Sequence, residues 1–372
     1  METRAAASGD ALRTQPMVIN PYVRVTYCSD SEVLVKHGSR SRFSQIVSDE
    51  GKTKLIGRLL RSARDQVTLT ELEQQGVIKP TEMDDATKLA SYLLDRQILI
   101  RPSDYLPHVY LAMQYGTHAT AITDRTIGLI GAGPLGSRVA RELARVQPKG
   151  IRLLDGRKLR EVHRSCFDID SALVQPGMLF QEAAAQDLRA RGFTAATPVE
   201  GLLTDQRAMT DVLDACDLAV VALESYSPRT LHAVNEVALT LRKPWMSLYC
   251  DGSEALVGPI YVPHETACYS EFELQNEANV ALRDDYLLHK ETLLGVDLET
   301  AELALPPYLS MMSGWATAAL LPFLASGRSF AVGRAVRIDF ERVSVDYQDV
   351  LKLPRCPACM QRRSGYPRHL FL

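Results

Sequence analysis

Residues 126–146 read TIGLIGAGPLGSRVARELARV and contain an apolar strand, a glycine turn and an amphipathic helix. The apolar run before the turn is typical of a buried strand, and the apolar residues after it recur at helical spacing. A second apolar strand, IRLLD, follows at 151–155 and a third, LAVVALE, at 218–224, with a helical pattern at 181–192 between them. This alternation predicts a parallel, doubly wound α/β sheet.

The glycine turn has the pattern G-x-G-x-x-G, formed by Gly131, Gly133 and Gly136, and Asp155 ends the next strand. Glycines in this context allow a tight turn, the helix N-terminus favours phosphate, and the strand-end acid accepts hydrogen bonds from ribose hydroxyls. The pattern predicts a nucleotide-binding fold, with strand-to-helix packing alone as the alternative. Glu224 ends the third strand and faces the same crevice, either as a site residue or as a strand-end charge.

The composition excludes several classes of protein. The chain has 372 residues, of which 46% are hydrophobic and 23% charged, as in ordinary globular proteins of about two domains. A net charge of −3 supplies no field to attract nucleic acid or anionic lipid. We find no apolar run of membrane-spanning length and no secretory signal, so we expect a cytoplasmic protein that binds neither nucleic acid nor membrane.

The N-terminal region has a different pattern from the rest of the chain. Residues 1–17 are small and polar, which predicts a flexible tail. Three short alternating segments at 22–28, 32–38 and 42–47 predict a small sheet, and three helical stretches follow at 51–63, 68–76 and 81–97. Residues 18–103 therefore form a predicted winged-helix-like α+β domain. The second domain, 104–372, ends with further strand patterns and one apolar helix at 306–327.

Seven cysteines are scattered along the chain, and Cys356 and Cys359 form a C-x-x-C pair near its end. In a reducing compartment this spacing suggests metal or redox chemistry rather than disulfides. The pair supplies two of the four ligands of a structural zinc site. Cys268 is the third candidate, and the candidates for the fourth are Glu271, Cys250, His264 and His369. The alternative is a pair that holds no metal.

The order of these parts resembles a known family. The turn GAGPLG, the strand ending at Asp155, the segment DGSEALVGPIYVPHETACY at 251–269 and the terminal CPAC resemble ThiF-like (ubiquitin-activating-enzyme-like) proteins of ribosomal peptide natural-product pathways. The resemblance covers about residues 18–372. It is strongest to the leader-peptide-binding proteins of azole and azoline biosynthesis, which are partners of a YcaO-type cyclodehydratase, and relatives of this kind also suggest a homodimer.

The resemblance implies a degenerate ATP and magnesium site. In adenylating relatives the strand-end acid is followed two places on by a second acid, then by a lysine that holds phosphates and an aspartate that binds magnesium. Asp155 is retained here, and Arg164 is a candidate phosphate contact. The other positions carry Arg157, then Phe180 or Gln181, then Glu224. Losing a cation and shifting a metal ligand weakens both ATP binding and transition-state stabilisation.

The resemblance also implies that the N-terminal domain is a precursor-peptide recognition element. In that family the leader peptide adds a strand to the third strand of the small sheet and lies against the third helix. The implied contacts are Arg42, Phe43, Ser44, Gln45, Ile46 and Val47 on the strand, and Lys88, Ser91 and Tyr92 on the helix. Arg42 and Lys88 are candidates to contact acidic leader residues, with ordinary solvated charges as the alternative.

These features together lead to one expected function and two alternatives. We expect a protein without chemistry of its own that binds the leader and presents the core peptide to the cyclodehydratase, which converts Cys, Ser or Thr residues into azolines. The first alternative is an ATP-dependent adenylyltransferase-like enzyme that itself activates a carboxylate or amide of the peptide. The second is a DNA-binding regulator, which the near-neutral charge disfavours.

Overall fold

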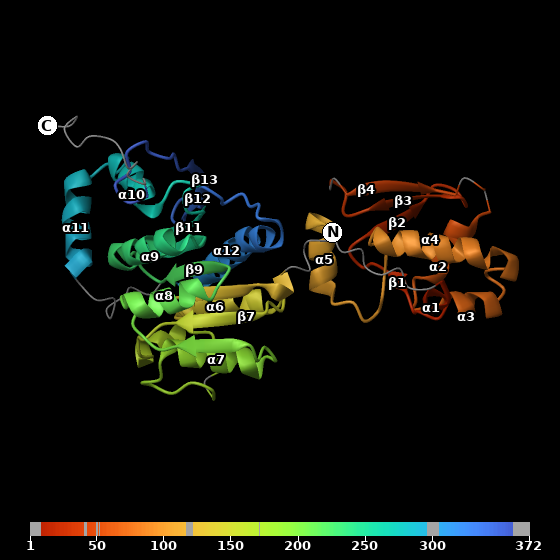
Figure 1. Ribbon diagram of the computed structural model, residues 1–372, viewed down its shortest axis with the longest axis horizontal. Helices are drawn as coiled ribbons and strands as arrows, with labels where there is room; N and C mark the ends of the chain where they lie inside the picture. Colours follow the sequence, from red (N-terminus) through yellow and green to blue (C-terminus); the bar gives the residue numbers. More distant parts are fainter. Residues whose placement is uncertain are drawn as a thin grey trace. The chain divides into compact units, whose positions relative to one another are not determined.

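The computed structural model describes residues 9–40, 43–49, 51, 53–116, 122–170, 172–295 and 305–359. The chain divides into two compact units, Met1–Thr117 and His118–Leu372, and Figure 1 colours both along the sequence. Each unit has its own buried apolar core. We describe the two units separately.

The N-terminal unit contains the predicted small sheet. Strands β2 (Arg24–Tyr27), β3 (Glu32–Lys36) and β4 (Ser44–Ser48) are antiparallel in the order β2-β3-β4. Alternate residues face the core, so Val33 and Val35 are fully buried. Within the described part of this unit β4 pairs only with β3, which makes β4 an edge strand.

Three helices follow this sheet along the chain. They are α2 (Leu55–Ser62), α3 (Leu69–Gln74) and α4 (Met83–Asp95), which follows the short helix η1 (Pro80–Glu82). α2 packs against β3, and α4 packs against α2 and α3. α3 begins at a capping box in which the Thr68 side chain accepts from the Glu71 backbone N–H and the Glu71 carboxylate accepts from the Thr68 N–H. A small second sheet pairs β1 (Val18–Ile19) with β5 (Leu99–Ile100).

Two segments of this unit differ from the sequence-based expectation. Part of the predicted tail forms α1 (Gly9–Arg13), and Leu12 and Met17 are buried in the core of the unit. Two isolated apolar residues in a polar stretch give no periodic pattern, so the sequence did not indicate this packing. The unassigned segment after residue 103 forms α5 (Leu106–Tyr115), whose Tyr110 ring packs edge-on against Tyr22.

The second unit is built on an eight-stranded mixed sheet in the order β13-β12-β11-β10-β9-β6-β7-β8. Five strands are parallel: β6 (Thr126–Ile130), β7 (Gly150–Leu154), β8 (Ala196–Val199), β9 (Leu218–Leu223) and β10 (Trp245–Asp251). The other three are antiparallel: β11 (Glu254–Tyr261), β12 (Arg334–Asp339) and β13 (Ser344–Asp349). The parallel, doubly wound prediction is therefore correct for the first five strands, and a ligand crevice is expected between β6 and β9, where the strand order reverses.

Helices flank both faces of this sheet (Figure 1). A Cβ at Gly128 would point at Val212 of α8 (Gln206–Asp214), whereas the next side chain along β6, Leu129, lies against Gly136 of α6 (Pro134–Ala144). Because neighbouring residues of a strand point to opposite faces, α6 and α8 lie on opposite sides. α7 (Phe180–Ala190) and α12 (Pro306–Ser326) pack beside α6, and α9 (Pro228–Leu241) packs beside α8. α10 (Tyr269–Ala278) and α11 (Arg283–Gly295) pack against α9.

α12 is the predicted apolar helix, and it is long and apolar enough to span a membrane by length and composition. In the structure 56% of its most apolar window is buried inside the protein. It packs against α6 and β11, with Leu309, Met312 and Leu320 buried. Its apolar side chains thus contribute to the packed interior of the second unit.

Candidate functional site

The glycine turn lies between β6 and α6, at the reversal of strand order. Gly131 has a φ of +96°, and a Cβ there would lie 2.0 Å from the Ala222 carbonyl oxygen. A Cβ at Gly136 would lie 1.9 Å from the Gly131 carbonyl oxygen. Both positions therefore require glycine for close packing of the strand against the helix, whether or not a nucleotide binds.

Three charged side chains lie beside this turn, where the ligand crevice is expected: Asp155, Arg157 and Glu224, which we call the Arg157 cluster. Asp155 is 0% exposed, Glu224 2% and the Arg157 side chain 12%. Arg157 donates from Nε to Asp155 Oδ1 at 2.8 Å and from Nη2 to Asp155 Oδ2 at 2.7 Å. The same Nη2 donates to Glu224 Oε2 at 3.1 Å. The guanidinium thus joins two carboxylates that come from the ends of different strands.

The two carboxylates also bind backbone donors of the turn and of α6. Asp155 Oδ2 accepts from the Ala132 N–H at 2.8 Å, and Glu224 Oε1 accepts from the Leu135 N–H at 3.0 Å. Leu135 is in the first turn of α6, where free N–H groups and the helix dipole favour an anion. A Cβ at Gly133 would lie 2.6 Å from Glu224 Oε1. The Glu224 carboxylate therefore occupies an anion position of the kind that binds phosphate in this fold.

The charge on Arg157 is fixed by its surroundings. Burial opposes that charge, but the Asp155 and Glu224 carboxylates outweigh burial and raise the pKa of the guanidinium above its usual value. The Phe180 ring lies 5.3 Å from the guanidinium carbon and closes one side of the cluster. Sequence reasoning noted Arg157 only as a departure from a family pattern; its position two residues after Asp155 was the signal for this pairing.

The structure does not bring Arg164 to this crevice. Arg164 lies in the short helix η3 (Glu161–Ser165), is half exposed and pairs with Glu161 at 3.2 Å. Its described contacts include none with the glycine turn or with Asp155. Gln181, near the position where adenylating relatives carry lysine, is buried in α7 and donates to the Val199 carbonyl oxygen at 3.5 Å.

The residues predicted to bind a peptide lie on β4 and α4 of the N-terminal unit. Along β4, Val47 is buried and faces the core, whereas Ile46 is 65% exposed. On α4, Lys88, Ser91 and Tyr92 are exposed, and the Arg96 guanidinium carbon lies over one face of the Tyr92 ring, 5.4 Å from its centroid. Lys88 pairs with Asp85 at 3.5 Å. Phe43 packs against the core, Ser44 is exposed and Gln45 half buried, and Arg42 lies outside the described residues.

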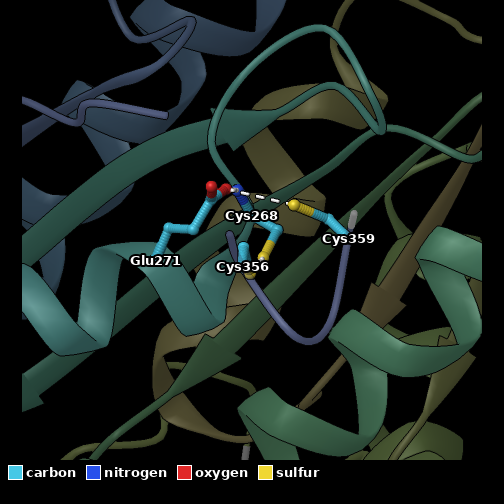
Figure 2. A group of neighbouring side chains, drawn as sticks. All are labelled: Cys268, Glu271, Cys356 and Cys359. Carbon is cyan, nitrogen blue, oxygen red and sulfur yellow. Dashed lines mark hydrogen bonds between the residues drawn. The ribbon is translucent and has the colours of Figure 1, made fainter. Parts of the chain in front are cut away.

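A second buried cluster contains Cys268, Glu271, Cys356 and Cys359, which we call the Cys/Glu cluster (Figure 2). Cys268 is the N-cap residue of α10, and Glu271 is in the first turn of the same helix. The two other cysteines come from the loop after β13. One ligand atom from each residue lies within 4.8 Å of those of the other three, and all four residues are buried.

The geometry and chemistry of this cluster fit a metal ion. Tetrahedral zinc with Zn–S bonds of about 2.3 Å places two sulfurs roughly 3.8 Å apart. The Cys268 and Cys356 sulfurs are 3.7 Å apart, too far for a disulfide. Burial and the neighbouring sulfur raise the pKa of the Cys268 thiol above its usual value, and burial does the same for Cys359. A bound cation would favour the thiolates instead.

The other sequence-based candidates for the fourth ligand lie elsewhere. The Cys250 thiol donates to the Met312 sulfur at 3.2 Å, on the α12 side of the sheet. His264 does not belong to the group of four ligand atoms, although its carbonyl oxygen accepts a hydrogen bond from Lys352. His369 lies outside the described residues. The structure thus brings Cys268, Cys356 and Cys359 together with Glu271.

Comparison with solved structures identifies proteins with a similar fold. E. coli MccB with succinimide superposes with a TM-score of 0.61 at 16% identity, covering 93% of this chain and 100% of that chain. The microcin C7 biosynthetic enzyme MccB in complex with N-formylated MccA gives a TM-score of 0.60 at 16% identity, with the same coverage. E. coli MccB with ATP gives 0.59 at 17% identity, again covering 93% and 100%. No curated protein matches the sequence.

The second unit also matches a protein-family model. The model of the ThiF family matches residues 113–358, which include the mixed sheet, the Arg157 cluster and Cys356. This span is more than half of the sequence. A Rossmann-like sheet with its glycine turn at the strand reversal is the adenylyltransferase-type architecture expected from the sequence, and the chain belongs to the ThiF family.

Proposed function

We propose that this protein binds the leader of a ribosomally synthesised precursor peptide and presents the core peptide to a partner YcaO-type cyclodehydratase for azoline and azole formation. The N-terminal unit, residues 18–103, acts as a winged-helix-like precursor-peptide recognition element. The ThiF unit, residues 104–372, acts as the scaffold. The chain raises the local concentration of the core peptide at the partner and does no chemistry itself.

The observation that carries this proposal is the open edge of β4. An edge strand presents a row of backbone N–H and C=O groups to any extended chain that adds to it. The described residues of the N-terminal unit include no strand on the outer side of β4. Ile46 pairs with Leu34 on the outer face of the sheet and exposes its side chain, which supplies an apolar contact beside the open backbone.

Helix α4 supplies polar and aromatic contacts for the bound leader. Tyr92 is 41% exposed, and Lys88 pairs with the exposed Asp85. A surface pair of this kind is worth at most about 1 kcal/mol, so an acidic leader residue can replace Asp85 at little cost. In this arrangement, backbone pairing with β4 supplies affinity for any extended peptide. The side chains of β4 and α4 select which leader sequence binds.

The similarity to MccB supports peptide capture. MccB has been crystallised in complex with N-formylated MccA. That likeness covers 93% of the present chain, so it includes the N-terminal unit as well as the ThiF unit. The Arg157 cluster supports a binding role over chemistry, because Glu224 already holds the anion position at α6 and Arg157 holds both carboxylates.

A titration tests the peptide-binding proposal. Fluorescein-labelled leader of the cognate precursor is titrated with the full chain, and fluorescence anisotropy reports binding. Ile46→Asp is expected to weaken binding at least about tenfold, which corresponds to about 1.4 kcal/mol. The matched control is Val343→Asp, which changes an 84% exposed residue of the ThiF unit and leaves leader affinity unchanged. Absence of leader binding by the wild type would refute the proposal.

A second candidate function is that of an ATP-dependent adenylyltransferase-like enzyme that activates a carboxylate or amide of the peptide. MccB with ATP favours it, as does the retention of Asp155 beside the glycine turn. This function requires Arg157 to leave both carboxylates so that phosphates can reach α6. Pyrophosphate release from ATP in the presence of precursor peptide, lost in Asp155→Ala, would establish it.

The partner and the assembly are separate parts of the proposal. The resemblance to leader-binding proteins implies a YcaO cyclodehydratase, a homodimer and a cytoplasmic location. Co-purification of the full chain with the cyclodehydratase, with and without the precursor peptide, tests the partnership. Light scattering of the purified chain tests the dimer.

A further inference from the structure

We propose that Glu271 is the fourth ligand of a zinc site completed by Cys268, Cys356 and Cys359. The site therefore has three sulfurs and one carboxylate oxygen, instead of four sulfurs. The inference concerns the Cys/Glu cluster alone and does not depend on whether the protein binds a peptide. It assigns Glu271 a ligand role in addition to its role in the capping box of α10, where its carboxylate accepts from the backbone N–H of the N-cap residue Cys268.

The first argument is the orientation of the Glu271 carboxylate. Oε1 accepts from the Leu353 N–H at 2.6 Å, and Oε2 accepts from the Cys268 N–H at 2.7 Å. Oε2 also accepts from the Cys359 thiol at 3.3 Å, the interaction visible in Figure 2. The two backbone donors, one on each oxygen, thus hold the carboxylate with Oε2 facing the Cys359 sulfur. For tetrahedral zinc, with a Zn–O bond of about 2.0 Å, the oxygen-to-sulfur separation is roughly 3.5 Å.

The second argument is the charge balance of the cluster. Glu271 is 0% exposed, and the hydrogen bonds to its carboxylate come from two backbone N–H groups and the Cys359 thiol. A buried carboxylate without a cation is strongly unfavourable, whereas the Asp155 and Glu224 carboxylates share Arg157. A divalent ion held by three thiolates and this carboxylate supplies the missing positive charge.

The third argument is the chemistry of the donor set. Three thiolates select zinc and other soft or borderline ions over magnesium and calcium, which require oxygen ligands. Zinc accepts mixed sulfur and carboxylate sets in tetrahedral geometry. The two final cysteines are 88 residues from Cys268 and Glu271 along the chain, so the metal would fasten the loop after β13 to the start of α10.

The test uses Co²⁺ as a spectroscopic probe of the reduced, full-length protein. Cobalt in a tetrahedral site gives d–d bands whose position reports the number of thiolates, and zinc is then added to displace it. The wild type is expected to bind one Co²⁺ with a three-thiolate spectrum. Glu271→Cys is expected to keep one metal and shift the bands to those of a four-thiolate site.

Two further variants separate ligation from capping. Glu271→Gln keeps a side-chain acceptor but loses the charged ligand, and its Co²⁺ affinity is expected to fall by more than the roughly 10- to 100-fold that removal of an outer-shell partner causes. Glu265→Gln changes an exposed glutamate near the cluster and is expected to leave the spectrum and affinity unchanged. Identical d–d bands in the wild type, Glu271→Gln and Glu271→Cys would overturn the ligand role. Failure of the wild type to bind Co²⁺ and Zn²⁺ would overturn the metal site.

Discussion

The Arg157 cluster and the Cys/Glu cluster both bury carboxylates in the ThiF unit, but only the first contains its own cation. Asp155 and Glu224 share the Arg157 guanidinium, and backbone N–H groups complete their hydrogen bonds. Glu271 receives backbone N–H groups too, yet its remaining neighbours are three thiols. In the first cluster the guanidinium balances the charge of the two carboxylates. In the second cluster a bound metal ion would balance the charge of the carboxylate and the thiolates.

The largest expected effect comes from removing the internal cation. Arg157→Ala leaves two buried carboxylates facing each other, so the free energy of unfolding should fall by roughly 3–5 kcal/mol. Urea denaturation of the full chain measures this loss. Arg164→Ala is the matched control, since Arg164 is half exposed and its removal should change stability by less than about 0.5 kcal/mol. A loss below about 1 kcal/mol for Arg157→Ala would contradict the comparison.

The second effect concerns the metal. Zinc at 100 times its dissociation constant should add about 2.7 kcal/mol to the free energy of unfolding, and a chelator should remove that gain. Differential scanning fluorimetry with and without zinc measures the shift in melting temperature. Cys356→Ser should abolish the zinc-dependent shift, and Cys28→Ser, at an exposed thiol, should preserve it. If zinc raised the melting temperature of Cys356→Ser and Cys28→Ser equally, the Cys/Glu cluster would not be the zinc site, and the contrast with the Arg157 cluster would be wrong.

A smaller effect is expected within the Arg157 cluster itself. Glu224→Gln keeps an acceptor for the Leu135 N–H, and Arg157 retains its bidentate contact with Asp155. The loss in the free energy of unfolding should therefore be about 2 kcal/mol, the value of a hydrogen bond to a charged group. The same urea titration measures it. A loss as large as that of Arg157→Ala would mean that Glu224, and not the guanidinium, holds the cluster together.

The smallest effect is expected at an ion pair of the N-terminal unit, which serves as a baseline for both buried clusters. Arg58, with help from the Lys79 N–H, lowers the pKa of Glu82 from 4.5 to about 2. A lowered folded-state pKa stabilises the protein above the unfolded value, and this contribution is lost as the pH falls from about 4.5 through about 2. Melting temperatures of the wild type and Glu82→Gln should converge over that range. A constant difference would show that the pair does not titrate as expected.

Much of the fold could be predicted because local sequence patterns, such as apolar runs, helical periodicity and a capping box, correspond to the helices and strands that form. The run TIGLI, the glycine turn and the helix after it form β6 and α6 as expected, and the capping box at Thr68 starts α3. β8 was missed because it has only four residues and includes Pro198, which an edge strand tolerates. α5 was missed because its apolar residues do not follow one face.

The candidate sites were predicted in part. Spacing identified Cys356 and Cys359, and it could not choose among Glu271, Cys250, His264 and His369 for the fourth ligand. That choice depends on which loop returns to the start of α10 after more than 80 intervening residues. In the same way, the sequence recorded Arg157 and Glu224 as departures from a family pattern without indicating that they bind each other.

The sequence by itself determined the strand-turn-helix unit, the small N-terminal sheet and the residue types of both clusters, because these follow from periodicity and from neighbours along the chain. Only the tertiary structure decided that Arg157 joins Asp155 to Glu224 and that Glu271 faces the three sulfurs. These contacts join strand ends and loops that are far apart in sequence, and their stability depends on burial, which excludes the water that would otherwise solvate each charge.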